Sequence, residues 1–361
     1  GPTEEYGYIH LGVPVGSREF QILKLNSLVD NFIENCKCDE IVEDAQSKWV
    51  YLLWVIRQKF PFWFRHMCPT VTCLVEAKIE THLRNKFNTV LDLECSDRVW
   101  EKACLPVKNH GCGLGKPKDI ISAAFAANVE ETMEAVQGIL PGTIPYMSMI
   151  HAPTEDFDAF DFQSEEIKVF VRGAREHKAV IIAAATELGE LQSLNDYDAQ
   201  VDKRKTQHVY SDFNNRSNVK HMEDLIQDHG DLQERAGFLS NDGSLAGAWI
   251  FSIPKDTHSK MTSSEFRIAM KLRLDINFLT LADKCCCKNQ TSICQRGIHL
   301  FTCNDFSNLF LMRHDAIQHT LKQLGLHGAI NVIDSKLGQM MEEDGRKARR
   351  PSFQRSRQEW L

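Results

Sequence analysis

SREFQILKLNSLVDNFIENC, which spans residues 17–36, carries a helical pattern from which the fold class can be inferred. Its apolar side chains recur at helical spacing, with polar and charged residues between them: Phe20, Leu23, Leu28, Phe32 and Ile33. Ser17 precedes the first of them, and its hydroxyl can accept a hydrogen bond from an amide of the first helical turn. We expect one helix that begins after Ser17 and runs to about Cys36.

The neighbouring segments continue this organisation. HLGVPVGS at 10–17 is strand-like. A second apolar helix around 49–56 is expected to end toward Phe60-Pro61, because the residue before a proline disfavours helical backbone. Further helices are expected at 73–87, 100–106, 120–136, 165–193, 220–237 and from Thr262 onward. Few segments alternate as strands do, so the predicted fold class is mostly α.

Several stretches lack a helical pattern. HGCGLG at 110–115 must be a loop, since its glycines leave the backbone weakly restrained, and turn chemistry fits it better than phosphate binding. The stretch 195–220 is polar, shows no apolar period and is expected to be a linker or an exposed loop. Prolines and acidic residues at 139–165 mark a boundary. We therefore expect four regions: 1–140, helical; 141–237, a helical linker region with long polar loops; 238–325, a metal-binding module and a following helix; 326–361, a basic, disordered tail.

The composition is that of an ordinary globular protein, with 43% apolar and 25% charged residues and a net charge of −7. No run of 18 apolar residues predicts a membrane span, so no membrane partner is expected. The first residues, Gly1 and Pro2, are not followed by a signal-peptide pattern, and the chain is expected to be a fragment or a processed product. The predicted location is intracellular, either nuclear or cytoplasmic.

Five of the twelve cysteines lie between positions 285 and 303, together with His299. Thiols and an imidazole this close in sequence fit a metal in a reducing compartment better than a secreted disulfide framework. A structural zinc ion takes four thiolate or imidazole ligands, usually as two closely spaced pairs. The predicted ligands are Cys285, Cys287, His299 and Cys303, with Cys294 as an alternative ligand.

Several segments, taken in order, resemble the region downstream of the polymerase palm in reverse transcriptases of non-long-terminal-repeat retroelements. They include HLGVPVGS at 10–17 and Trp100-x2-Ala103-x-Leu105-Pro106 followed by GCGLG at 111–115. The later ones are AGAWI at 246–250, SSEFRIAMKLRL at 263–274, GIHLFTC at 297–303 and RHDAI at 313–317. The resemblance implies a thumb-like helical region at 1–140 and a small CCHC-type zinc-binding module with one structural zinc ion.

The resemblance also implies that the chain as given is not an enzyme. The family's polymerase uses an Asp-Asp pair to hold two metal ions, and no Asp-Asp pair occurs in this sequence. Arg350-Pro351-Ser352 stands where the family's endonuclease carries an acidic residue after its Arg-Pro step, and it offers no carboxylate.

Basic residues are the predicted nucleic-acid contacts. Arg57, Lys59, Arg65 and His66 flank a cluster of aromatic residues, an arrangement that can hold phosphates and stack on bases. The alternative is that the aromatic residues Phe60, Phe62, Trp63 and Phe64 form core while the arginines reach water. The remaining predicted contacts are Arg313 and the basic residues of the tail, Arg346, Lys347, Arg349 and Arg350.

Two functions follow as expectations. The first is a non-catalytic nucleic-acid-binding part of a retroelement reverse transcriptase, which holds RNA or an RNA/DNA duplex. The second is a host-recruited remnant of such an element that serves as a zinc-containing structural protein or binds protein partners.

Overall fold

The computed structural model describes residues 6–37, 42–139, 162, 164–199, 205–243, 246–255 and 259–277, and twelve further positions: 279, 284, 285, 287–289, 293, 295–297, 299 and 303. The chain divides into two compact units, Gly1–Asn277 and Phe278–Leu361. The described part is mostly helical, and its strands are confined to one hairpin. This confirms the mostly α fold class. The predicted divisions after residues 140 and 237 fall inside the first unit, and the predicted tail at 326–361 lies outside the described residues.

The first unit opens with a hairpin and a helix. Strands β1 (Gly7–His10) and β2 (Val13–Gly16) are antiparallel, and the left-handed backbone of Leu11 and Gly12 forms the turn between them. Helix α1 (Arg18–Asn35) then begins after Ser17, whose hydroxyl accepts from the Phe20 amide at 3.2 Å. The predicted strand, N-cap and helix are confirmed.

Three helical segments follow one another without a break: α3 (Ala45–Tyr51), the π-helix η2 (Leu52–Ile56) and α4 (Arg57–His66). The predicted end at Phe60-Pro61 is wrong, because Pro61 lies inside α4. Phe60, Trp63 and Phe64 on either side of the proline are buried in the main core. Their burial outweighs the cost of the hydrogen bond that the proline cannot donate.

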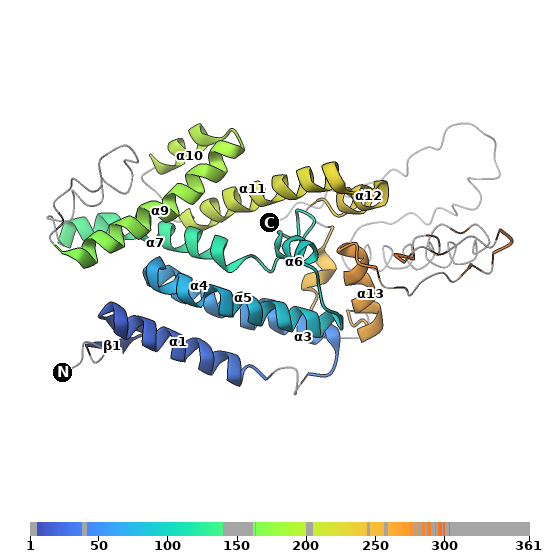
Figure 1. The fold of residues 1–361 in the computed structure, drawn as a ribbon, viewed down its shortest axis with the longest axis horizontal. Coiled ribbons are helices and arrows are strands. Elements are labelled where there is room, and N and C mark those ends of the chain that lie inside the picture. Colours follow the sequence, from blue (N-terminus) through green and yellow to red (C-terminus); the bar gives the residue numbers. More distant parts are fainter. Residues whose placement is uncertain are drawn as a thin grey trace, which may run out of the picture. The chain divides into compact units, whose positions relative to one another are not determined.

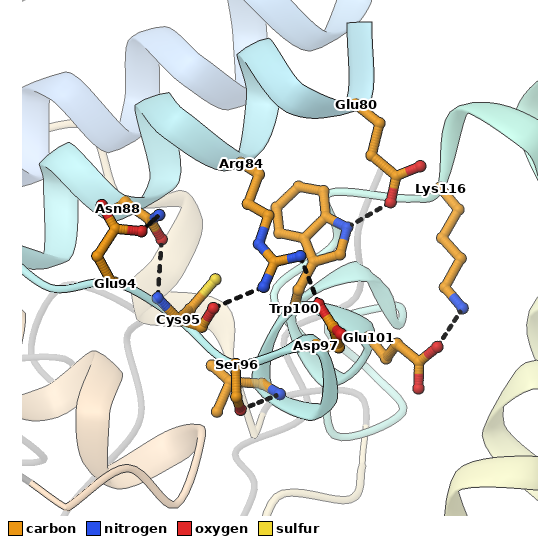
Figure 2. Close-up of polar contacts among 11 residues, drawn as sticks. Glu80, Arg84, Asn88, Glu94, Cys95, Ser96, Asp97, Trp100, Glu101 and Lys116 are labelled. Atoms are coloured by element: carbon orange, nitrogen blue, oxygen red, sulfur yellow. Dashed lines mark hydrogen bonds and ion pairs between the residues drawn. The ribbon is translucent and has the colours of Figure 1, made fainter. Parts of the chain in front are cut away.

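Helix α5 (Pro69–Leu91) carries a polar network that positions the short helix α6 (Asp97–Cys104). Figure 2 shows Arg84 donating to the Cys95 carbonyl and the Asp97 carboxylate, both at 2.6 Å. It also shows the Trp100 indole N–H donating to the Glu80 carboxylate at 2.8 Å. These contacts hold the side chain of Trp100, which belongs to α6, against α5 and in the main core. Trp100 is the first residue of the Trp100–Pro106 segment named above.

A second helical layer is built by α7 (Pro117–Ile139), α9 (Glu165–Glu187), α10 (Leu191–Asp198) and α11 (Thr206–His229) (Figure 1). Helix α7 packs against α4 and α5 on one side and against α9 and α11 on the other. The predicted linker at 195–220 is wrong, because α11 begins at Thr206. The buried face of α11 contains the aromatic Tyr210 and Phe213 together with the polar Thr206 and Asn214, so the sequence shows no clear apolar period there.

The first unit ends with α12 (Leu232–Ser240), the 3₁₀ helix η5 (Ala248–Phe251) and α13 (Ser263–Arg273). Helix α13 begins with a capping box, in which the Thr262 hydroxyl accepts from the Glu265 amide and the Glu265 carboxylate accepts from the Thr262 amide. The predicted start at Thr262 is confirmed.

The last residue of α13 joins three separate segments. Arg273 is 4% exposed, and its guanidinium donates to backbone carbonyls of Val107 (2.6 Å), Gly111 (2.9 Å) and Ala246 (2.9 Å). A Cβ atom on Gly247 would lie 2.1 Å from Val107 Cγ1, so this glycine permits the close approach. The GCGLG, AGAWI and SSEFRIAMKLRL segments therefore meet at one buried cation.

We predict that Arg273→Lys lowers the free energy of unfolding by about 2–4 kcal/mol, because a lysine offers a point charge and cannot reach three carbonyls in the geometry of a guanidinium. Denaturant unfolding followed by circular dichroism measures the change. The control is Arg267→Lys on the same helix: Arg267 is partly exposed, donates to the Val90 carbonyl, and should cost less than about 1 kcal/mol. Equal losses in the two variants would contradict this role for Arg273.

Candidate metal centre

Four side chains of the second unit converge on one point. The Cys285 and Cys303 sulfurs are 3.8 Å apart, and the Cys287 sulfur lies 3.6 Å from His299 Nε2. All four ligand atoms lie within 4.8 Å of one another. A tetrahedral site with Zn–S bonds of ~2.3 Å and a Zn–N bond of ~2.0 Å requires S···S edges of ~3.8 Å and S···N edges of ~3.5 Å. The cluster could therefore bind a metal ion, and its spacing is compatible with zinc.

The cysteines of the cluster lie in buried, apolar surroundings, which disfavour a charged thiolate when no cation is present. Cys285, Cys287 and Cys303 are buried, and the partly buried Ile293 packs against them. Burial raises the pKa of the Cys285 thiol to about 11, with the neighbouring thiols of Cys287 and Cys303 acting in the same direction. A bound divalent cation would reverse this preference by stabilising the thiolates.

The local chain geometry explains how the two ligand pairs are presented. Gly297 has φ +66°, a left-handed conformation that allows a tight turn just before His299. The backbone amide of Leu279 donates to the Gln295 carbonyl at 2.9 Å, which ties the segment before the first cysteines to the turn. The predicted convergence of Cys285, Cys287, His299 and Cys303 is confirmed. The alternative ligand, Cys294, lies outside the described residues.

The predicted nucleic-acid contacts divide into two groups. Arg57 donates to the Leu114 carbonyl at 2.8 Å, and burial lowers the pKa of its guanidinium. Arg65 is half-buried, forms an ion pair with Glu131 and donates to Gln207 at 2.8 Å. Both arginines therefore bind groups of the protein itself. Arg57 supports the 111–115 loop, whose Gly113 and Gly115 have positive φ, so the turn interpretation of this loop is confirmed.

Lys59 and His66, in contrast, are exposed. The Lys59 ammonium lies 5.6 Å from the centroid of the Trp63 ring, and the His66 ring lies 4.8 Å from Phe62. The core interpretation of the aromatic residues is confirmed for Phe60, Trp63 and Phe64, whereas Phe62 is 40% exposed. The other predicted contacts lie outside the described residues: Arg313, Arg346, Lys347, Arg349 and Arg350.

Sequence reasoning missed a serine–histidine pair between α7 and α9. The Ser122 hydroxyl and His177 Nδ1 are 2.8 Å apart, and Ser122 is 1% exposed. Such a pair is the beginning of a nucleophile and its base, but this hydroxyl has no access to solvent. The pair therefore joins two helices. The two residues are 55 positions apart, so no local pattern could have indicated their contact.

No described helix has both the length and the apolar composition that crossing a membrane requires.

We predict that Cys285→Ser and Cys303→Ser lower the bound zinc, measured by elemental analysis, from about one ion per chain to near zero, because each removes one of four ligands. Chelation should lower the melting temperature of the wild-type chain, since metal binding contributes to folding. The matched control is Cys73→Ser, which changes an exposed free cysteine of α5. Full metal content in the Cys285 and Cys303 variants would disprove the centre.

We predict that the stability of the folded chain depends on pH through His177, because burial lowers the pKa of this side chain to about 4. In the unfolded chain His177 takes up a proton as the pH falls through about 6.5, whereas in the folded chain it stays neutral until about pH 4. The free energy of unfolding is therefore highest above about pH 6.5 and decreases as the pH falls toward about 4. Allowing for partial exposure, we expect a loss of about 1 kcal/mol. His177→Gln should flatten the stability profile over this range, and an unchanged profile would contradict the assignment.

Comparisons of the chain with models of protein families, with curated proteins and with solved structures found no match. The resemblance to reverse transcriptases stays a prediction from the sequence motifs.

Proposed function

We propose that this chain is a non-catalytic, nucleic-acid-binding part of a retroelement reverse transcriptase, with a structural zinc ion at Cys285, Cys287, His299 and Cys303. The convergence of these four side chains carries the proposal. The resemblance predicts a zinc motif at this place in the order of segments, and the predicted residues come together. With four protein ligands, such a site has no open position for a reacting water and would stabilise the fold.

The contacts within the first unit support the thumb-like assignment. The segments that carry the resemblance lie far apart in sequence, yet they pack on one another. Arg273 of the 263–274 segment donates to the carbonyls of Gly111, in the 111–115 segment, and of Ala246, in the 246–250 segment. Segments that form one packed unit are more informative about common origin than isolated matches are.

The alternative is a host-recruited remnant that keeps the helices and the zinc ion and serves as a structural protein or binds protein partners. Two observations favour it. The net charge of −7 is unusual for a nucleic-acid-binding protein, and Arg57 and Arg65 are engaged by groups of the protein.

The two functions are separated by binding to an RNA–DNA template–primer at low and at moderate salt. We expect binding at low salt that weakens as salt rises, because phosphate contacts release counterions. Lys59→Glu should weaken binding at low salt by about fivefold or more, since it replaces an exposed cation with an anion.

Lys24→Glu is the matched control, because Lys24 is also an exposed lysine whose ammonium lies over an aromatic ring, 5.7 Å from the centroid of Phe20, but on α1. Absence of binding at the lowest salt would remove the proposed function and leave the alternative.

A further inference from the structure

The segment around the π-helix lacks acidic residues. Residues 45–75 contain Lys48, Arg57, Lys59 and Arg65 but no aspartate or glutamate, although the whole chain has a net charge of −7. The segment forms α3, η2 and α4 and reaches into the start of α5. A polyanion approaching its solvent-facing side meets no repulsive carboxylate from this stretch of chain.

The exposed side chains of this segment form a stripe. Trp54 is 55% exposed, Val55 45% and Phe62 40%, and Lys59 and His66 are exposed as well. Residues four positions apart are neighbours on an α-helix surface, and the Phe62 and His66 rings of α4 lie 4.8 Å apart, with Lys59 on the same helix. Trp54 and Val55 lie on the π-helix η2, which continues directly into α4. We call these five residues the aromatic stripe. Large apolar side chains gathered on a surface mark a binding site more often than scattered ones do.

A second element widens one end of the stripe. Phe251 of η5 is 42% exposed, and its ring centroid lies 6.3 Å from that of Trp54, nearly edge to face. Two exposed aromatic rings from separate segments therefore meet at this end. Trp54 and Phe62 are eight residues apart, or about 12 Å along the helix axis, which leaves room for more than one nucleotide between them.

We propose that the aromatic stripe binds unpaired nucleotides of a single-stranded nucleic acid, whose bases stack on Trp54 and Phe62 while Lys59 and His66 contact phosphates. Aromatic platforms with neighbouring cations are how proteins hold single strands without reading their sequence. Base pairs inside a duplex present their phosphates, sugars and groove edges, so the exposed rings have no stacking role there. This inference rests on the proposed function and names the form of nucleic acid that this surface takes.

The test compares two ligands, a blunt RNA–DNA duplex and the same duplex with a short single-stranded extension. The full chain should bind the extended duplex about thirtyfold more tightly than the blunt one, which corresponds to two stacked bases at the lower end of the usual stacking energy. Trp54→Ala should reduce this preference to about fivefold, the effect of the one base that still stacks on Phe62, and should leave binding to the blunt duplex unchanged. Trp54→Phe should keep more of the preference than Trp54→Ala does. The control Leu232→Ala, at an apolar residue of α12 that is 81% exposed, should keep the full preference.

The possible results distinguish this inference from the proposed function. Equal binding of both ligands, or a preference that Trp54→Ala leaves at its full size, would overturn the single-strand inference and leave nucleic-acid binding in place. No binding of either ligand would remove both. Self-association of the chain that Trp54→Ala abolishes, with no preference for the extension, would assign the stripe to a second copy of the chain and overturn the inference.

Discussion

The buried guanidinium of Arg273 is the interaction on which the arrangement of the first unit depends. It is a cation whose described hydrogen bonds go to carbonyl and amide oxygens instead of a carboxylate. A buried charge has lost its water, and leaving it without hydrogen-bond partners costs several kcal/mol. The carbonyl groups that accept from Arg273 are therefore held in place. The loops at 105–115 and 241–251 are thereby fixed relative to the end of α13. The same loops position Trp49, whose indole N–H donates to the Ile250 carbonyl at 3.1 Å inside the main core.

The close packing around Arg273 explains why the neighbouring segments at 111–115 and 246–250 contain glycine and a small buried cysteine. The glycines at 111 and 247 leave room for neighbouring chain, since a Cβ on Gly111 would lie 2.0 Å from the Leu105 carbonyl oxygen. Cys112, at the centre of the loop, is fully buried, and this burial raises the pKa of its thiol to about 12. It acts as a small apolar residue in this place. The glycine-rich loop at 111–115 thus contributes Cys112 and Leu114 to the core.

The sequence predicted the elements whose signals are local. The helix after Ser17, the helix that begins at Thr262 and the four converging metal ligands each depend on residues within about 20 positions of one another. The errors arose where distant contacts outweigh local preference. Pro61 stays helical because of its buried neighbours, and α11 forms in a polar stretch because its polar groups find partners on other helices. Lys178 of α9 illustrates this: it is buried, and its ammonium binds the Tyr210 hydroxyl of α11 and the Asp198 carboxylate.

The same distinction between local and distant contacts separates the two kinds of basic residue in α4. Arg57 and Arg65 find oxygen partners 57 and 66 residues away, so their charges are satisfied inside the first unit. Lys59 and His66 have only aromatic and backbone neighbours within α4, and their charge-bearing groups face solvent. Arg65 forms an ion pair with the Glu131 carboxylate and therefore attracts a phosphate weakly, because the pair has little net charge. The Arg57 guanidinium keeps its charge but is directed to the Leu114 carbonyl of the protein. The attraction of α4 for a polyanion therefore comes mainly from Lys59 and His66, which neighbour the exposed Trp54 and Phe62. Attraction between charges weakens as salt rises, whereas stacking of bases on these two aromatic rings does not depend on charge.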